Sequence, residues 1–265
     1  MSLSKRAKDF AYWRAMRVFK GIRMRYRGAK AAKRFAPTDE RVRYPSYKSL
    51  DELLDVERLR AMDASVTQKV LDCLGDGAGI AFNTGPLKDP LKSIYPGSTV
   101  LELTSANRPF KYFDLTQPEI WKPTPLAETF SEVMDFARSL PFEITTRIIV
   151  MADAKGRAVT MHRDHGNVDD LHDFVWFRTN LKKPFFVADP TRTERAYLRS
   201  YTAWFDTVNQ YHGADAADGL TISMRVDGTF TEAFRAQIPQ PACNPACTPS
   251  LWATLAGEAG PQPAS

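Results

Sequence analysis

Residues 142–230 form a run of short segments with an alternating pattern. Apolar and polar side chains alternate there with a period of two, which is typical of strands. Turns are predicted between the segments at 153–156, 182–183 and 213–219, and no helical pattern lies between them. The segments predicted as strands are 144–152, 157–162, 174–181, 184–188, 195–201, 203–207 and 220–227. Short strands in such succession indicate a barrel or a two-sheet jelly roll.

The first half of the chain has helical patterns instead. Helices are predicted at 49–62, where Ser49 is a candidate N-cap, at 66–74, and at 125–140, which starts with a proline and has apolar residues at helical spacing. One strand is predicted at 98–104. Together with the later strands, this order predicts an α+β fold in which helices pack on one face of a β core.

These patterns divide the chain into four parts. Residues 1–36 are predicted as a basic helical arm, 37–141 as a helical and loop region that packs on the core, and 142–235 as the β core. Residues 236–265 contain six prolines, seven alanines and one charged residue, so we expect a flexible, loosely ordered tail. A chain of 265 residues, 43% of them apolar, is long enough to bury one sizeable core.

The basic arm holds most of the positive charge of the protein. Residues 1–35 contain twelve lysines and arginines and one acid, Asp9, for a net charge of +11, whereas the whole chain carries only +5. Apolar residues recur every three or four positions between Phe10 and Tyr26, as in a basic amphipathic helix. Two interpretations stay open: residues 5–34 bind an anionic membrane surface or glycolipid, or they pack on the domain. An organellar presequence has similar chemistry.

Other features of the sequence bear on its location and partners. No segment approaches the roughly 20 consecutive apolar residues of a membrane-spanning helix, and the start lacks the pattern of a secretory signal. The cysteines, Cys73, Cys243 and Cys247, are too few and too scattered for a disulfide framework. We therefore expect a cytoplasmic protein, with peripheral binding at the inner face of the membrane. Nucleic acid is not an expected partner, because no helix-turn-helix pattern is found.

The candidate chemistry lies in the predicted β core, which contains all four histidines. His162 and Asp164 are two positions apart at the end of a predicted strand, so an imidazole and a carboxylate point to one side. His212, where an apolar run ends in polar residues, is expected to supply a third ligand. Two imidazoles and one carboxylate on one face of an ion are typical of non-haem iron(II) oxygenases. His165 competes with His162 as a ligand, and His172 is interpreted as a loop residue.

An arginine is predicted to point toward this group. The segment 220–227 alternates apolar residues with polar ones that include Ser223 and Arg225. If its apolar side packs against the sheet, Arg225 points into the barrel, where a buried arginine needs an anion. The planar fork of an arginine suits a carboxylate, to which Ser223 adds a hydroxyl. Arg178 and Asn180, on another predicted strand, are further candidates for binding a carboxylate.

The order of these residues resembles the iron(II)- and 2-oxoglutarate-dependent dioxygenases, which have a double-stranded β-helix core. The matching elements are His-x-Asp at 162–164, a distal histidine at 212 and an arginine at 225. Within that superfamily, residues 177–215 resemble the aspartyl/asparaginyl β-hydroxylase-like branch, in which a similar arginine-bearing strand, polar turn and histidine-bearing strand follow one another. The arginine lies four residues further along than in some members of that branch, although an even offset keeps it on the same face.

This resemblance implies a double-stranded β-helix, or jelly-roll, core and a role for each candidate residue. The residues that would bind Fe(II) are His162, Asp164 and His212. Arg225 and Ser223 would hold the far carboxylate of the co-substrate 2-oxoglutarate, and Arg178 or Asn180 would support it or contact the substrate. The implied reaction uses 2-oxoglutarate and O2 to hydroxylate an unactivated C–H bond, with succinate and carbon dioxide as co-products.

The resemblance and the basic arm together suggest a class of substrate. Members of the similar branch act on lipid-linked sugars and fatty acyl chains as well as on proteins and amino acids, so an envelope lipid or lipid-linked sugar is the first hypothesis. Specificity would come from loops at 83–122 and 189–194. The alternative hypothesis is a non-catalytic, cupin-like metal-binding β-barrel that docks on an anionic surface through its basic N-terminal helix.

Overall fold

The computed structural model describes residues 47–75, 80–81, 98–107, 115–162, 164, 173–188, 195–207 and 211–238. Several predictions therefore fall outside the described residues. They concern the basic arm, the loop at 189–194 with parts of that at 83–122, His165, His172, and the tail beyond residue 238 with Cys243 and Cys247. Within the described part of the chain, none of the helices is both long and apolar enough to cross a membrane.

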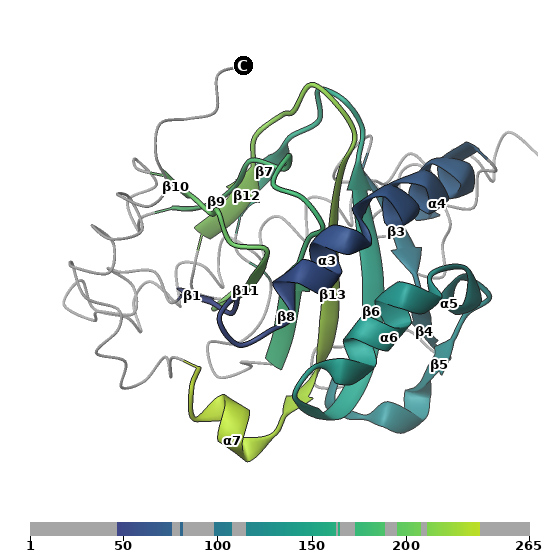
Figure 1. Ribbon diagram of the computed structural model, residues 1–265, viewed down its shortest axis with the longest axis vertical. Coiled ribbons are helices and arrows are strands. Elements are labelled where there is room, and N and C mark those ends of the chain that lie inside the picture. The colour runs from purple at the N-terminus through teal and green to yellow at the C-terminus, as the bar shows by residue number, and fades with distance from the viewer. Residues whose placement is uncertain are drawn as a thin grey trace, which may run out of the picture.

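Two antiparallel sheets form the centre of the described structure (Figure 1). The seven-stranded sheet has the order β1-β11-β8-β13-β6-β3-β2, and the four-stranded sheet has the order β10-β9-β12-β7. The strands of the larger sheet are β1 (Tyr47–Ser49), β2 (Ile80–Ala81), β3 (Ser98–Glu102), β6 (Phe142–Asp153), β8 (Asp173–Phe177), β11 (Thr202–Phe205) and β13 (Thr221–Phe230). Those of the smaller sheet are β7 (Val159–His162), β9 (Phe185–Ala188), β10 (Arg195–Tyr197) and β12 (Tyr211–Ala214). A separate antiparallel pair consists of β4 (Thr104–Ala106) and β5 (Trp121–Pro123).

The strand predictions are largely confirmed. Each predicted segment of the core overlaps an observed strand, and helices are absent between β6 and β13 among the described residues. β12 differs from the prediction, because residues from 213 onward were expected to form a turn and instead continue the strand that contains His212. Gly213 permits this close packing, since a Cβ atom there would lie 2.7 Å from the carbonyl oxygen of Val159 in β7. A glycine inside so short a strand reads as a turn in the sequence.

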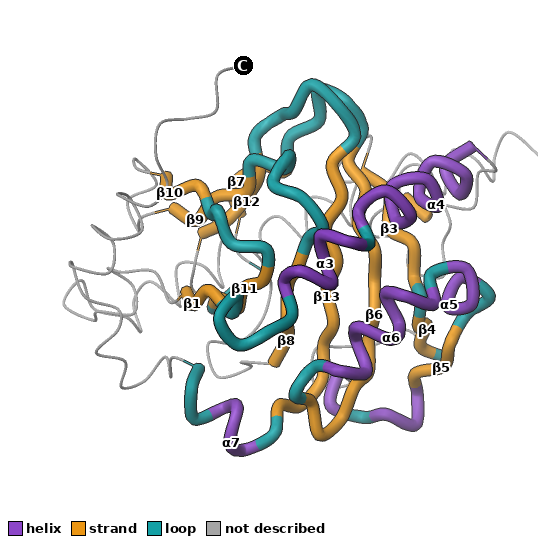
Figure 2. The backbone as a smooth tube through the Cα atoms, viewed as in Figure 1, coloured by secondary structure: helices purple, strands orange, loops and turns teal. Residues whose placement is uncertain are grey.

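The helices keep their predicted order but have different boundaries (Figure 2). They are α3 (Val56–Ala61), α4 (Asp63–Gly75), the 3-10 helix η3 (Pro118–Ile120), α5 (Leu126–Thr129), α6 (Ser131–Ser139) and α7 (Glu232–Arg235). Ser49 lies in β1 and caps no helix; the carboxylate of Asp55 caps α3 by accepting from the N–H of Arg58. The predicted helix at 125–140 divides at Phe130, whose backbone (φ −101°, ψ 43°) is not helical and whose side chain is buried.

One face of the seven-stranded sheet packs against the helices. On β13, Met224 pairs with Phe177 of β8 and shares its face. The ring of Phe177 lies 5.0 Å from that of Phe136 in α6, measured between centroids. Figure 1 shows α3, α4 and α6 over this side of the sheet. The helices therefore cover one face of the core, as predicted.

The opposite face of this sheet turns toward the four-stranded sheet. Arg225 of β13 pairs with Trp176 of β8, and the indole of Trp176 stacks on Phe185 of β9 with centroids 4.6 Å apart. Alternate residues of one strand share a face, so Ser223 and Asp227 lie on the inner face together with Arg225. Charged groups therefore lie between the two sheets.

Replacing Gly228 with alanine is expected to destabilise the protein by about 1–3 kcal/mol, the usual cost of overpacking a core. Gly228 follows a register shift between β13 and β6, and a Cβ atom there would come within 1.9 Å of the carbonyl oxygen of Ile144. The backbone must move to relieve this contact. Urea denaturation measures the change, with Gly219→Ala as the control, since nothing lies within 4 Å of a Cβ atom at Gly219. Equal unfolding midpoints for the two variants would contradict the prediction.

Candidate metal centre

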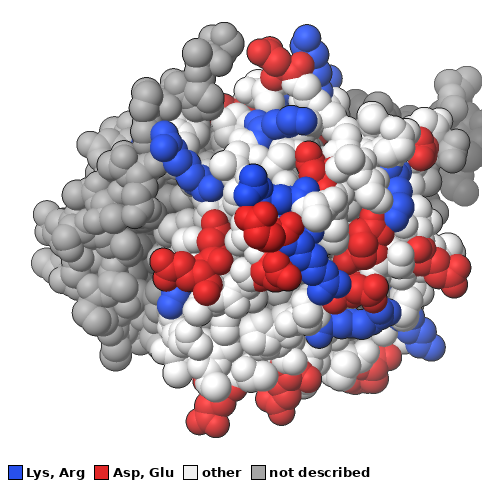
Figure 3. Space-filling model, viewed as in Figure 1, with Lys and Arg blue, Asp and Glu red and all other residues white. Residues whose placement is uncertain are grey.

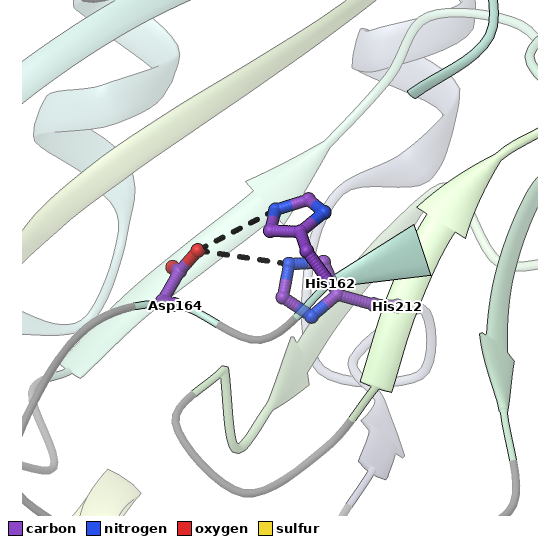
Figure 4. Close-up of side chains that lie close together, drawn as sticks. All are labelled: His162, Asp164 and His212. Atoms are coloured by element: carbon purple, nitrogen blue, oxygen red, sulfur yellow. Dashed lines mark ion pairs between the residues drawn. The ribbon is translucent and has the colours of Figure 1, made fainter. Parts of the chain in front are cut away.

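His162, Asp164 and His212 lie together where β7 and β12 meet. His212 pairs with His162 across these two strands, so both imidazoles lie on the same face, with ring centroids 4.4 Å apart. Oδ1 of Asp164 lies 3.6 Å from Nε2 of His162 and 3.8 Å from Nε2 of His212 (Figure 4). One ligand atom from each residue lies within 4.8 Å of the other two. Because metal–ligand bonds are about 2.0–2.2 Å long, small side-chain rotations suffice to bring these donors around one ion.

Backbone groups orient the ligand atoms. Nδ1 of His162 lies 2.7 Å from the carbonyl oxygen of Thr160, which only accepts hydrogen bonds. With Nδ1 engaged there, Nε2 is the ring nitrogen that lies on the side of Asp164 and is placed to bind a metal. The backbone N–H of Asp164 donates to the carbonyl oxygen of Thr207 at 2.7 Å, which holds this residue just beyond the end of β7.

The group is partly open to solvent. The side chains of His162 and Asp164 are 29% and 18% exposed, whereas that of His212 is only 7% exposed. The ring of His212 packs near Phe205, with centroids 5.1 Å apart, and near Phe185, at 6.2 Å. Aromatic rings therefore fix the inner ligand while the outer two are accessible to an ion from solution.

Arg225 lies beside the triad, on the inner face of the sheet, as the alternation of side chains along 220–227 predicted. Its Nη1 lies 3.4 Å from Oδ2 of Asp164, and its Nε donates to Oδ1 of Asp227 at 2.8 Å. Asp227 is fully buried, and its other oxygen accepts from Nε of Arg147, also at 2.8 Å. The guanidinium of Arg225 lies 4.1 Å from the ring centroid of Phe174. Positive and negative side chains therefore alternate in a row from Arg147 through Asp227 and Arg225 to Asp164 of the triad.

Ser223 lies two residues before Arg225 on the same face of β13, and its side chain contacts a lysine. Its Oγ accepts from Nζ of Lys183 at 2.9 Å, and the same Nζ lies 2.6 Å from Oδ2 of Asp153. All three side chains are buried. Lys183 therefore adds a second cation to the inner face, where the sequence had pointed only to Arg225.

The contacts of Arg178 and Asn180 differ from those expected of co-substrate ligands. β8 ends at Phe177, so the alternation that was expected to aim both side chains inward stops before them. Arg178 is fully buried and donates to three backbone carbonyls, those of Leu198, Lys183 and Ser200. Burial lowers the pKa of Arg178 to about 10. Asn180 donates through Nδ2 to Asp63 of α4 at 2.6 Å. These contacts give both residues a structural role.

Besides Lys183, sequence reasoning missed three charged residues near the site. Asp227 had a visible signal, because it lies two positions after Arg225 on the same strand and therefore on the same face. Arg147 and Asp153 lie on β6, and only the pairing of β6 with β13 brings them close. No spacing in the sequence predicts that pairing.

These side chains define a candidate two-histidine, one-carboxylate metal centre on a scaffold of antiparallel sheets. No protein-family model and no curated protein matches the chain. Solved structures with some similarity include prolyl hydroxylases and a protein of the 2OG-Fe(II) oxygenase family.

The similar structures share little sequence with this chain. A Trichoplax adhaerens prolyl hydroxylase, solved with a hypoxia inducible factor peptide fragment, is 13% identical, with 74% of this chain and 88% of that chain covered and a TM-score of 0.46. A Pseudomonas putida prolyl-4-hydroxylase is 11% identical, with 70% and 91% covered and a TM-score of 0.38. The oxidoreductase of the 2OG-Fe(II) oxygenase family, from Burkholderia pseudomallei, is 15% identical, with 49% and 68% covered and a TM-score of 0.34. At such values the function has to be argued from the residues of the chain itself.

Proposed function

We propose that this protein is an Fe(II)- and 2-oxoglutarate-dependent oxygenase that hydroxylates an unactivated C–H bond. The observation that carries the proposal is the meeting of His162, Asp164 and His212, with one ligand atom each within 4.8 Å of the others. Two neutral imidazoles and one carboxylate are the donor set that non-haem Fe(II) oxygenases use.

The residues of the site fit this metal. Nε2 of His162 lies on the side of Asp164, Asp164 supplies a carboxylate, and His212 is held by aromatic neighbours. An ion bound by these three donors would keep open positions for a chelating co-substrate and O2, and would supply the redox chemistry of the reaction. The partial exposure of His162 and Asp164 leaves a path for such ligands.

The strand order supports a double-stranded β-helix. Among the consecutive strands from β6 to β13, the larger sheet contains β6, β8, β11 and β13, and the smaller sheet contains β7, β9, β10 and β12. The chain therefore crosses repeatedly between two facing sheets, as in a jelly roll. Membership of the aspartyl/asparaginyl β-hydroxylase-like branch stays a prediction from residues 177–215.

The inner face suits an anionic co-substrate. Arg225 and Lys183 place two cations on it, and Ser223 adds a hydroxyl. Asp153 pairs with Lys183 and Asp227 pairs with Arg225, so the inner face is not an uncompensated positive patch. What suits a carboxylate of 2-oxoglutarate is the guanidinium of Arg225, because it lies beside the triad and has several N–H donors. Arg178 and Asn180 have no part in this proposal, since their donors are engaged by Leu198, Ser200 and Asp63 among others.

Anaerobic titration of the full chain with Fe(II), followed by 2-oxoglutarate, tests the proposal. We expect one Fe(II) per chain and 2-oxoglutarate binding that is strong only after the metal has bound. With O2 and ascorbate, the loaded protein is expected to convert 2-oxoglutarate to succinate. Absence of Fe(II) binding would rule out the proposed function. The non-catalytic alternative is not favoured, because a barrel that only docks on a surface needs no arginine beside three metal ligands.

We also propose a cytoplasmic location at the inner face of the membrane, with an envelope lipid or lipid-linked sugar as substrate. Basic and acidic side chains are interspersed on the face shown in Figure 3. The charge of residues 5–34 is the feature that supports the proposal. Each Lys or Arg near an anionic membrane contributes about 1 kcal/mol of attraction. Deleting residues 1–35 is therefore expected to reduce sedimentation with phosphatidylserine vesicles at least about fivefold. Neutral vesicles are the control, and equal sedimentation of both proteins with anionic vesicles would contradict the membrane role.

A further inference from the structure

We propose that Arg225 is a positioning residue for Asp164, which it holds so that a single carboxylate oxygen faces the two imidazoles. This inference rests on the proposed function, because it concerns the metal site. It also goes beyond the expectation that Arg225 only anchors the co-substrate.

The two oxygens of Asp164 have different neighbours. Oδ1 lies 3.6 Å and 3.8 Å from the Nε2 atoms of His162 and His212, whereas Oδ2 lies 3.4 Å from Nη1 of Arg225. A carboxylate binds a metal through one oxygen or through both. With Oδ2 held by the guanidinium, only Oδ1 is offered to an ion. One more position on the ion is then open to other ligands.

Arg225 is itself held in place. Its Nε donates to the fully buried carboxylate of Asp227 at 2.8 Å, and its guanidinium lies 4.1 Å from the ring centroid of Phe174. The planar guanidinium has donors on two sides, so it contacts both carboxylates at once. Arg147 donates to the other oxygen of Asp227, so the contact of Oδ1 with Arg225 does not depend on it.

Asp164 needs such support because it lies just beyond the end of β7. Its backbone N–H is fixed by the carbonyl oxygen of Thr207. That hydrogen bond fixes the position of the backbone and does not itself orient the carboxylate. Arg225 supplies a cation 3.4 Å from Oδ2 of Asp164.

The charge of Arg225 and its proposed positioning role predict opposite changes in metal affinity when Arg225 is replaced by a neutral residue. A guanidinium beside a cation site repels the ion, so its removal alone would strengthen metal binding. Loss of a group that orients a metal ligand instead weakens binding by about 10–100-fold. Arg225→Gln therefore separates the two effects by the sign of the change.

The test is a titration of the full chain with Co(II) in the absence of 2-oxoglutarate, so that any role of Arg225 as an anchor has no influence. We expect Arg225→Gln to bind Co(II) about 10–100-fold more weakly than wild type. We also expect its visible absorption spectrum to change, because both oxygens of Asp164 become available to the ion. Arg147→Gln is the matched control, since it also removes one of the two arginines from Asp227, whereas the 3.4 Å contact with Asp164 belongs to Arg225. Its affinity is expected to stay within about threefold of wild type, because the ligand keeps its support.

The outcomes separate the inference from the function on which it rests. Wild-type protein that binds no Co(II) or Fe(II) would overturn both. Wild-type binding with equal or tighter binding by Arg225→Gln, and an unchanged spectrum, would overturn only the positioning role. Thermal melting of the metal-free variants checks folding, and Arg225→Lys provides a second variant that keeps the charge but loses the planar fork. Weaker binding by Arg225→Lys supports the inference, and wild-type affinity contradicts it.

Discussion

An Asp164→Ala variant is expected to lose more than about 100-fold in affinity for Fe(II) and to release no succinate above background. Loss of a group that merely orients a metal ligand already costs about 10–100-fold, and Asp164 is a ligand itself and the carboxylate of the triad. The two remaining imidazoles are neutral, so the charge of the ion loses its compensating anion. Anaerobic calorimetric titration measures the affinity, and succinate formation with 2-oxoglutarate and ascorbate measures turnover.

Asp215→Ala is the matched control for this variant. Asp215 directly follows β12, three residues after His212, but its carboxylate accepts from Arg195 and Tyr197 instead of facing the triad. Its removal is expected to leave Fe(II) affinity unchanged. Asp164→Ala is expected to change the free energy of unfolding by less than about 1 kcal/mol, because its carboxylate is partly exposed. Unchanged Fe(II) affinity in Asp164→Ala would place any bound metal elsewhere and end the proposal.

The period-two pattern predicted the strands because it reflects packing between two layers. On β13, nearly every residue is buried, yet Met224 faces the helices while Arg225 faces the other sheet. The alternation thus separates two kinds of buried environment, and the inward direction of Arg225 followed from it. The same reasoning failed on β8, because the strand ends at Phe177 and Arg178 turns to backbone carbonyls. Where a strand ends depends on its partner strand, which the local sequence does not specify.

Part of the candidate site follows from neighbouring residues in the sequence, and part depends on strands that pair only in the folded protein. His162 and Asp164 are two residues apart at the end of a strand, so the local sequence was enough to predict that their side chains lie close together. His212 joins them through the pairing of β12 with β7, about fifty residues away in the chain, and a resemblance supplied what spacing alone did not. Lys183 reaches Asp153 and Ser223 only in the folded chain. No periodicity indicates that contact, because a lysine in a predicted turn is ordinarily exposed.

Replacing Asp227 with alanine is expected to destabilise the protein by about 3–5 kcal/mol, the cost of removing one partner from a buried ion pair. The carboxylate is fully buried and accepts from Nε of Arg225 and Nε of Arg147, both at 2.8 Å. Without it, two guanidinium groups are left in a poorly solvated space. Such a loss is a large part of the about 5–15 kcal/mol that stabilises a typical domain. Urea denaturation measures it without adding salt that would screen the charges.

Asp135→Ala is the control, because it removes a carboxylate from an exposed pair with Arg138 on α6. That pair is expected to contribute less than about 1 kcal/mol. A double variant, Asp227→Ala with Arg147→Gln, then shows which arginine causes the cost. The side chain of Arg147 is 19% exposed and can turn toward water, whereas that of Arg225 is 11% exposed and packs against Phe174. Removing Arg147 should therefore recover only a minor part of the lost stability. Full recovery, or equal losses for Asp227→Ala and Asp135→Ala, would mean that Arg225 is not held by Asp227 in solution.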